Sequence, residues 1–296
     1  MIRLAALFVA LVLPTLAQGM DVIHREKSLY RNIEVKESGS RRCLVFAVKR
    51  GDRNQSCMDL RNPNHVVFPY ARMTFSGLLL NDEPASFLIV GLGGGTLPMV
   101  LSQMYPDAVI DVIEIDPAVN RVAQDFFDFR ETEKMKVHVI DARVFVKRAA
   151  LKKQSYDYVI LDAFTGDYIP EHLMTVEFLE ETKAILGENG VLVANTFTTS
   201  ELYSHESETY RAVFGEFFNF KMPITGNRII VAGVQPLPQR LQLRGRANRM
   251  TGRMTRYRVN IEDFPRYMRK SRDWDESARP LTDQYSPVNL LQGETP

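Results

Sequence analysis

The sequence predicts an α/β fold in which a Rossmann-like, mostly parallel sheet follows a small antiparallel β domain. Two observations lead to this prediction. Between residues 86 and 195, five short apolar runs alternate with segments of helical pattern. Strands that alternate with helices form a parallel sheet with both faces covered. Before residue 61 the pattern consists of short β-rich runs joined by polar turns, which indicates antiparallel hairpins.

The composition is that of an ordinary globular protein. The chain has 296 residues, of which 45% are hydrophobic and 25% charged, and its net charge is +1. This length suits one large domain, or a large and a small one, and the near-zero charge gives no reason to expect a nucleic-acid partner. We predict a leader or anchor over 1–19, a β domain over 20–80, the Rossmann-like domain over 81–235 and a basic helical segment over 236–296.

The first residues have the three parts of a secretory signal peptide. Arg3 is the only charged residue before Asp21, an apolar run covers 4–13, and small residues follow up to Ala17. The apolar run is shorter than the roughly 20 residues that a membrane-spanning helix needs. We therefore expect a periplasmic or otherwise exported protein, with the leader cleaved or kept as an anchor. The alternative is the buried first helix of a cytoplasmic protein.

The two cysteines, Cys43 and Cys57, lie in strand-like segments on either side of a polar turn. If the hairpin turns at Arg50 and Gly51, the two side chains face each other across the ladder. An exported protein can oxidise such a pair to a disulfide. Two free thiols in neighbouring strands are the alternative.

The strands of the large sheet are predicted in chain order. They cover 87–90, 109–114, 137–141, 158–162 and 191–195, followed by an antiparallel pair at 217–222 and 228–232. One helix is expected to begin near Thr96 and another at Pro117, because proline suits a first helical turn. A third is expected from Thr175 to Leu186, with Gly187 ending it.

The C-terminal part is rich in arginine. The stretch 236–272 holds ten arginines and one lysine against two acidic residues, a net charge of +9. Four arginines recur at helical spacing and would line one side of a helix: Arg246, Arg249, Arg253 and Arg256. Such a stripe fits an anionic partner, either lipid headgroups or nucleic acid. We favour the alternative, a solvated helical face, because few aromatic residues are interleaved.

A glycine-rich loop follows the first strand of the predicted sheet. Gly91, Gly93 and Gly95 allow a tight turn and a close approach of the backbone to a ligand. The helix from Thr96 would direct its N-terminus into the same cleft. The loop lacks the complete G-x-G-x-x-G pattern of dinucleotide sites. It fits the G-x-G-x-G loop of folds that bind S-adenosyl sulfonium nucleosides, so we predict a sheet of the S-adenosylmethionine-methyltransferase type.

Carboxylates end the next three strands. Glu114 stands 23 residues after Gly91, where an acid accepts hydrogen bonds from both ribose hydroxyls. Asp141 would accept from an exocyclic amino group such as that of adenine. Asp162 suits a cationic ligand, or an amine that must lose a proton. In this order the three acids predict a nucleoside site, while surface decoration is the alternative.

Longer segments surround these residues. They are 88–95, 112–117, 141–143, 156–164, 166–175 and 281–288, with an opening strand at 30–35. These segments resemble the spermidine synthase (polyamine aminopropyltransferase) family, and the fifth and sixth are similar to a bacterial spermidine-synthase-like branch. The resemblance covers nearly all of the chain after the leader.

The resemblance implies a small N-terminal β domain, a Rossmann-like catalytic domain and a homodimer. The family moves an aminopropyl group from decarboxylated S-adenosylmethionine to an amine acceptor, and no cofactor or metal is permanently bound. By position, Glu114 would hold the ribose, Asp141 with Ala142 the adenine, and Asp162 would be the base. The residues that would contact the amine substrate are Tyr70, Asp167 and Tyr285.

Two of the positions that depart from the family pattern concern the amine substrate. The family's glycine loop carries an aspartate that helps bind the amino end of the substrate, where this chain has Gly94, and a glutamine where it has Arg31. Losing a carboxylate and gaining a guanidinium weakens attraction for a diamine. The sequence thus leaves three functions open: an aminopropyltransferase or close variant, a methyltransferase-like enzyme that uses intact S-adenosylmethionine, and a non-catalytic exported nucleoside-binding or interaction protein.

Overall fold

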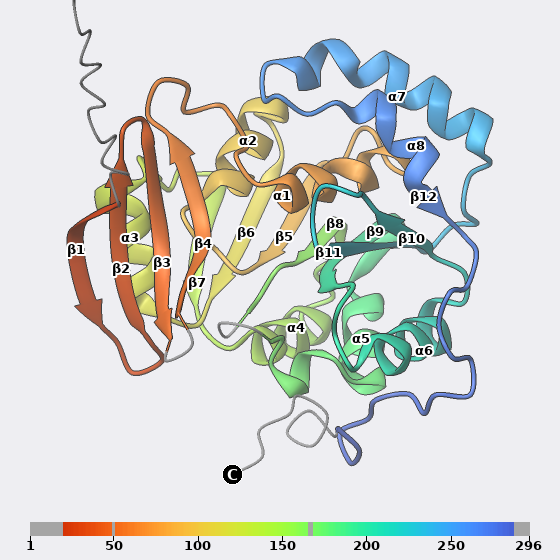
Figure 1. The fold of residues 1–296 in the computed structure, drawn as a ribbon. Helices are drawn as coiled ribbons and strands as arrows, with labels where there is room; N and C mark the ends of the chain where they lie inside the picture. Colours follow the sequence, from red (N-terminus) through yellow and green to blue (C-terminus); the bar gives the residue numbers. More distant parts are fainter. Residues whose placement is uncertain (1–19, 49–50, 165–167, 287–296) are drawn as a thin grey trace, which may run out of the picture.

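The computed structural model describes residues 20–48, 51–164 and 168–286. In these ranges the chain forms a four-stranded antiparallel sheet beside an eight-stranded mixed sheet, with helices around the larger one (Figure 1). The predicted leader over 1–19 lies outside the described residues. Within them, no helix combines the length and the apolar character needed to cross a bilayer.

The N-terminal sheet is a meander in the order β1-β2-β3-β4. Its strands are β1 (Asp21–Lys27), β2 (Asn32–Ser38), β3 (Arg41–Val48) and β4 (Gly51–Asp59). The predicted antiparallel unit is confirmed. No residue of β1 is fully buried, so its sequence lacks the apolar alternation that identifies a half-buried strand.

The cysteine pairing within this sheet is the predicted one. Cys43 on β3 stands opposite Cys57 on β4, and the two side chains form a disulfide. The ladder closes at Val48 and Gly51. Arg50 itself lies outside the described residues. The disulfide therefore links the middles of two paired strands beside the large sheet.

The large sheet has the order β12-β10-β11-β9-β8-β5-β6-β7. Its parallel strands are β5 (Ser86–Val90), β6 (Val109–Glu114), β7 (Met135–Val139), β8 (Tyr156–Leu161) and β9 (Leu186–Phe197). Strand β9 pairs parallel with β8 and antiparallel with β11. The antiparallel strands are β10 (Phe218–Lys221), β11 (Asn227–Gly233) and β12 (Met268–Arg269). The predicted α/β fold with a Rossmann-like sheet of methyltransferase type is confirmed.

Two predicted boundaries are wrong. The third parallel strand ends at Val139 rather than Asp141, because Asp141 caps the following helix. The helix that begins after Thr175 ends at Ala184, and Gly187 lies inside β9 rather than after a helix. In both cases a polar residue or a glycine beside an apolar run gave a misleading end point.

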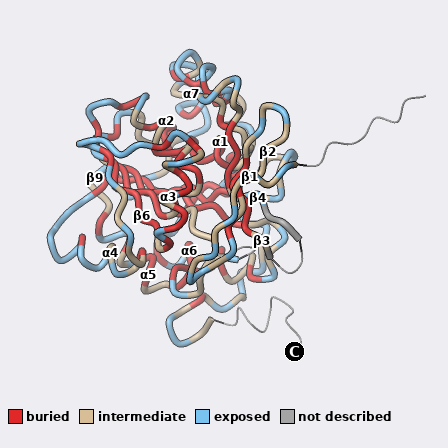
Figure 2. Tube along the Cα trace, turned by 90° about the vertical axis from the view of Figure 1, so that its left-hand side faces the viewer, coloured by how far each residue is buried: buried red, intermediate tan, exposed pale blue. Residues whose placement is uncertain are grey.

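Helices cover both faces of the large sheet. One face carries α1 (Pro69–Met73), η1 (Thr74–Leu79), α2 (Thr96–Met104), α3 (Pro117–Phe126) and α7 (Arg240–Thr255), and the other carries α4 (Ala142–Leu151), α5 (Val176–Ala184) and α6 (Tyr203–Phe214). Successive residues of β5 enter opposite cores: Phe87 packs in one and Leu88 in the other. The buried residues accordingly run through the middle of the molecule in Figure 2.

The arginine stripe of α7 is largely used within the protein. Arg246 donates to the carbonyl oxygens of Leu79 and Leu80 over 2.9 and 2.6 Å. Arg253 donates to the carbonyl oxygen of Met104. Arg249 lies 3.4 Å from the carboxylate of Asp82, which precedes β5. Short segments complete the C-terminal part: η3 (Ile261–Asp263) and α8 (Phe264–Tyr267). Arg249, Arg253 and Arg256 are exposed, as predicted for a solvated helical face, whereas Arg246 is half-buried.

Candidate active site

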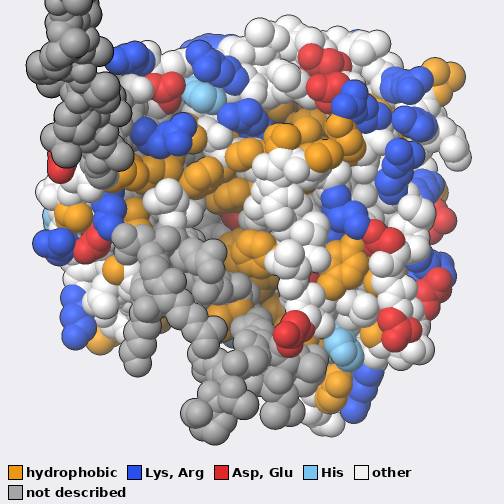
Figure 3. All heavy atoms as spheres, viewed as in Figure 1, with side chains coloured by type: hydrophobic (Ala, Val, Ile, Leu, Met, Phe, Trp, Pro, Cys, Tyr) orange, Lys and Arg blue, Asp and Glu red, His pale blue; other side chains and the backbone are white. Residues whose placement is uncertain are grey.

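A deep cleft opens where the parallel strands end, between the large sheet and strands β3 and β4. Counted with the open solvent at its mouth, the cleft spans about 1020 Å³. Hydrophobic side chains surround the hollow near the middle of Figure 3. The predicted residues that line this cleft are Tyr70, Gly91, Gly93, Glu114, Asp141, Ala142 and Asp162.

The glycine loop needs glycine for two separate reasons. Gly91 has φ +103°, and a Cβ there would stand 2.3 Å from the carbonyl oxygen of Asp162. Gly95 has φ +77° and precedes α2, and a Cβ there would strike the ring of Phe129 at 2.5 Å. L-residues with side chains avoid such φ values. The first glycine thus lets the loop pass directly against the backbone of the proposed base.

Gly94 has a different environment. A Cβ at this position would lie 2.9 Å from Oγ of Ser56 and 3.0 Å from Cδ1 of Phe127. Ser56 comes from β4 and lines the cleft, and Phe127 is buried. The space in which an aspartate side chain would begin is therefore occupied by the N-terminal sheet and by the end of α3.

Glu114 lies buried at the end of β6. Its Oε2 accepts from the backbone N–H of Leu92 over 3.2 Å, and its Oε1 accepts from that of Asp116 over 2.9 Å. Burial raises the pKa of the Glu114 carboxyl, and these two backbone donors and the charge of Arg31 oppose that rise. Each oxygen keeps a second acceptor position, so the side chain can still accept from ribose hydroxyls.

Asp141 occupies the N-cap of α4 rather than the end of a strand. Its Oδ1 accepts from the backbone N–H of Val144 over 3.0 Å, as a capping aspartate does. Its Oδ2 forms a 2.8 Å hydrogen bond with Nε2 of His172. Asp141 thus faces the cleft with both oxygens already in contact, and Ala142 beside it offers a small apolar surface for a base.

Asp162 follows β8 and is half-buried in the cleft. Burial raises the pKa of its carboxyl to about 7, while a hydrogen bond from Asn195 opposes the rise. The amide Nδ2 of Asn195 donates to Oδ1 over 2.8 Å, and Oδ1 of Asn195 in turn accepts from Asn227 over 3.0 Å. A carboxylate with a pKa near neutrality is suited to accept a proton under working conditions.

Asn195 was not among the predicted site residues. It closes the apolar run at 191–195, and that strand pairs directly with the one that ends at Asp162. A polar residue at the end of a buried strand, beside a strand that carries a proposed base, is the signal that would have identified it.

Tyr70 belongs to α1 and reaches the cleft from the side of β4. Its hydroxyl donates to the carbonyl oxygen of Gln55 over 3.1 Å. Gln55 is the extra residue of a β-bulge, since Leu44 pairs with Ser56 and Val45 with Asn54. Burial raises the pKa of Tyr70, and the negative charge of Asp162 adds to the rise. The phenol thus stays neutral and acts as a polar wall near the base.

Among the described residues, Tyr70 lines the cleft and Tyr285 does not. Asp167 lies outside the described residues. Tyr285 packs its ring 4.0 Å from Cζ of Arg279 and 6.2 Å from the His205 ring, and it does not belong to the lining of the cleft. In the described ranges, His, Cys, Asp and Glu side chains form no group of three or more that would hold a metal ion.

Arg31, noted as a departure from the family, lines the cleft with its charge compensated. Its Nη1 donates to the carbonyl oxygen of Phe164 over 3.2 Å, and its Nε lies 3.6 Å from Oδ2 of Asp116. The guanidinium stands 4.3 Å from the centre of the Phe46 ring. Because Asp116 is fully buried beside it, Arg31 repels a cationic substrate less than its charge alone implies.

The comparisons with known proteins agree with this geometry. Residues 68–232 match the model of the spermine/spermidine synthase domain. A curated polyamine aminopropyltransferase of Vibrio vulnificus is 49% identical over 294 residues, which is 98% of each chain. In a solved structure, a probable spermidine synthase of Corynebacterium glutamicum, the fold matches over 90% of this chain and 98% of that one, with a TM-score of 0.69 and 19% identity.

A human methyltransferase is also similar. The structure of methyltransferase-like protein 13 in complex with SAH covers 71% of this chain and 96% of its own, with a TM-score of 0.57 and 25% identity. This likeness extends to the sheet type but spans less of the chain than the aminopropyltransferase does. The family model matches more than half of the chain, and the Vibrio relative matches nearly all of it. The chain therefore belongs to the spermine/spermidine synthase family.

Proposed function

We propose that this protein is a polyamine aminopropyltransferase, which moves an aminopropyl group from decarboxylated S-adenosylmethionine to an amine acceptor. The feature that carries this proposal is Asp162, a carboxylate with a pKa of about 7. It lies in the same cleft as the glycine loop and Glu114. The near full-length likeness to the Vibrio polyamine aminopropyltransferase supports the same reaction.

The residues of the cleft divide the donor between them. The base of the nucleoside lies against Ala142, the ribose hydroxyls donate to Glu114, and the loop from Gly91 to Gly95 passes beneath the sulfonium end. A sulfonium cation close to Asp162 stabilises its ionised form and lowers its pKa. Binding of the donor thereby prepares the carboxylate to receive a proton.

The transfer is a substitution at carbon. The lone pair of the neutral amine forms a C–N bond to the methylene carbon next to sulfur, and the C–S bond breaks with its electron pair going to sulfur. Sulfur becomes neutral and leaves as methylthioadenosine. The new ammonium nitrogen loses its proton to the Asp162 carboxylate, which later passes it to water. No permanently bound cofactor takes part in this balance.

The test is product formation. Purified protein is mixed with decarboxylated S-adenosylmethionine and each of several diamines, and methylthioadenosine is measured by chromatography. We expect release that depends on the amine and that Asp162→Asn removes. Absence of release with every amine at high enzyme concentration, from protein that binds methylthioadenosine, would overturn the proposal.

The likeness to methyltransferase-like protein 13, solved with SAH, favours methyl transfer as a second candidate. Calorimetry separates the two candidates. Tighter binding of methylthioadenosine than of S-adenosylhomocysteine supports aminopropyl transfer, because the former lacks the amino acid tail. The opposite order supports methyl transfer. If the protein binds neither nucleoside, the result supports the third function, a non-catalytic exported interaction protein.

We also propose that residues 1–19 direct export. The signal-like pattern supports this, and so does the disulfide between Cys43 and Cys57, since disulfides persist mainly in oxidising compartments. A reporter fused to residues 1–20 and assayed in cytosol and periplasm tests it. Cytosolic reporter activity alone would contradict export.

We also propose that the protein forms a homodimer and that α7 contacts a membrane surface. Membership of the family supports a homodimer, which light scattering on the purified protein tests against a monomer mass. Contact of α7 with a membrane surface has less support, because Arg246, Arg249 and Arg253 already have partners within the protein. Sedimentation with anionic and neutral vesicles decides it, and equal binding to both would count against it.

A further inference from the structure

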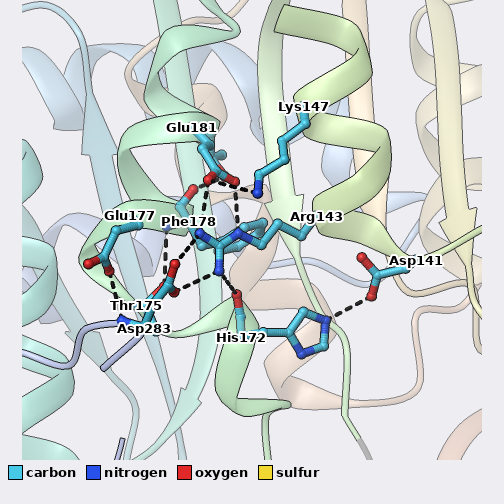
Figure 4. Close-up of polar contacts among 10 residues, drawn as sticks. Asp141, Arg143, Lys147, His172, Thr175, Glu177, Phe178, Glu181 and Asp283 are labelled. Atoms are coloured by element: carbon cyan, nitrogen blue, oxygen red, sulfur yellow. Dashed lines mark hydrogen bonds and ion pairs between the residues drawn. The ribbon is translucent and has the colours of Figure 1, made fainter. Parts of the chain in front are cut away.

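The side chain of Arg143 joins four parts of the chain beside the cleft (Figure 4). It lies in the first turn of α4 and is 12% exposed. A guanidinium has five N–H donors, and here each has an acceptor. Glu181 of α5 accepts two at 2.9 Å, Asp283 accepts two at 2.7 Å, and the carbonyl oxygen of His172 accepts the fifth at 3.5 Å.

These contacts close a ring around the start of α4. Arg143 donates to the backbone of His172, and the imidazole of His172 returns to the side chain of Asp141 over 2.8 Å. Figure 4 shows His172 placed between the two. Asp141 and Arg143 are two residues apart, so the start of α4 and the turn η2 (Glu171–Leu173) are connected at two points.

Both sides of this ring line the cleft. Asp141 and Ala142 come from the start of α4, and Pro170, His172 and Leu173 come from the segment around η2. The space between them is where the base of the nucleoside lies in the proposed function. We name this space, between Ala142 and residues 170–173, the base slot. Arg143 follows Ala142 directly and donates to the carbonyl oxygen of His172 on the other side.

The C-terminal segment completes the arrangement. Asp283 comes from 140 residues further along the chain. Its carboxylate also accepts from the hydroxyl of Thr175 over 2.8 Å, and its backbone N–H donates to Glu177 over 3.0 Å. The backbone N–H of Val176 donates to the carbonyl oxygen of Leu281 over 2.8 Å. Residues 281–283 are thus docked on the start of α5, directly behind the base slot.

We propose that Arg143 is the positioning residue of the base slot, and that docking of residues 281–283 through Asp283 is required for its full affinity. This inference rests on the nucleoside-binding part of the proposed function. A flat base gains from a slot whose walls are already at the right separation, because ordering them on binding would cost affinity. Lysine has three donors on a single nitrogen and cannot replace the planar fork between Glu181 and Asp283.

The chain offers a matched control. Lys147 lies one turn further along α4, is 57% exposed, and contacts Glu181 at 3.6 Å. Lys147→Gln therefore removes the same charge from the same helix face without touching His172 or Asp283. Asp283→Asn is the complementary variant, because it weakens the C-terminal contact and leaves the pair between Arg143 and Glu181 in place.

The measurements are the Kd of methylthioadenosine by calorimetry, and KM and kcat for decarboxylated S-adenosylmethionine, all on full-length protein. Arg143→Gln and Arg143→Lys are expected to raise Kd and KM about tenfold or more, since charge-assisted hydrogen bonds that hold the slot are lost, while kcat at saturating donor changes little. Asp283→Asn is expected to raise both by a smaller factor, and Lys147→Gln to leave them unchanged.

A merely structural role predicts another pattern. Arg143→Gln would then lower Tm and the active fraction while Kd and KM of the folded molecules stay at wild-type values, and that result would overturn the inference. If Arg143→Gln does not fold, Asp283→Asn decides by the same measure. Failure of the wild-type protein to bind methylthioadenosine would instead overturn the proposed function itself, and the inference with it.

Discussion

Asn195 donates its side-chain N–H to Oδ1 of Asp162 over 2.8 Å. Asp162 follows β8 and Asn195 lies within the neighbouring strand β9, in which Ala194 pairs with Leu161. In the described ranges, this bond is the one hydrogen bond to the Asp162 side chain. It orients the carboxylate and opposes the rise of pKa that burial causes. The protonation of the proposed base therefore depends first on burial and second on a residue of the next strand.

The first prediction concerns pH. In wild-type protein, kcat/KM should rise with pH around an apparent pKa of about 7, because ionised Asp162 accepts the proton and kcat/KM reports the free enzyme. Asn195→Leu removes a bond to the ionised form, so the rising limb should move to higher pH, with activity lost at pH 7 and largely regained at pH 9. Asn227→Leu keeps the bond to Asp162 and serves as the control. An unshifted limb in the first variant would refute this role.

Asp162→Asn separates catalysis from stability. The transfer rate should fall about 100- to 10,000-fold, the usual contribution of a positioned base, while binding of methylthioadenosine remains. Because the pKa of Asp162 in the folded protein lies above its ordinary value, the free energy of unfolding of the wild-type protein falls as pH rises toward 7. The Tm of the variant minus that of wild type should therefore increase from pH 5 to pH 8. A constant difference measured by calorimetry would contradict the raised pKa.

Glu114→Gln tests the ribose contact. Glutamine offers one acceptor oxygen where the carboxylate accepts from the N–H groups of Leu92 and Asp116, so one buried donor loses its partner. We expect a loss of about 1 to 3 kcal/mol in stability and weaker nucleoside binding in calorimetry. The same substitution at exposed Glu133 should leave both quantities at wild-type values. Equal affinity in the two variants would exclude Glu114 from the site.

Gly94→Asp should not create a better polyamine enzyme. The new Cβ would press on Ser56 and Phe127, and overpacking of this kind costs about 1 to 3 kcal/mol. We expect a lower Tm and no decrease in KM for a diamine. Gly94→Ala adds the Cβ without a charge and should lower Tm similarly. A stable aspartate variant with a lower diamine KM would show that the loop and β4 adjust more easily than the packing implies.

The disulfide should contribute measurably to stability. Cys43 and Cys57 are 14 residues apart, and closing a loop of this size stabilises a fold by about 3 kcal/mol. We expect no free thiols in air-oxidised, denatured protein, and a lower Tm after reduction. The double variant Cys43→Ala and Cys57→Ala should have the lower Tm with and without reductant. Two titratable thiols in the absence of reductant would contradict the pairing.

The sequence predicted those features that depend on neighbouring residues, such as strands and the glycine loop. The strand at 109–114 has the predicted bounds, although Asp111 interrupts its apolar residues. Glycine spacing located the loop, because Gly91 and Gly95 adopt positive φ values that residues with side chains avoid. Asp141 was predicted to end a strand, but it caps the helix α4. The two roles are hard to separate because both a strand end and an N-cap have an extended backbone.

Contacts between distant segments were beyond such reasoning. The pair of Arg143 and Asp283 spans 140 residues, and nothing in either segment identifies its partner. Tyr285 was expected near the substrate because its motif resembles the family, yet docking of residues 281–283 onto α5 directs that ring toward Arg279. The likeness to the family predicted that this tyrosine is present, but it did not predict which residues surround it.

The wall formed by β3 and β4 has a consequence for how such enzymes diversify. The glycine loop, Glu114 and Asp162 all lie on the large sheet, whereas Phe46 and Ser56 come from the small one and close the same cleft. One wall of the cleft and the proposed catalytic residues are thereby encoded in separate stretches of the gene. Exchange of the first sixty codons can therefore reshape that wall while the glycine loop, Glu114 and Asp162 stay unchanged.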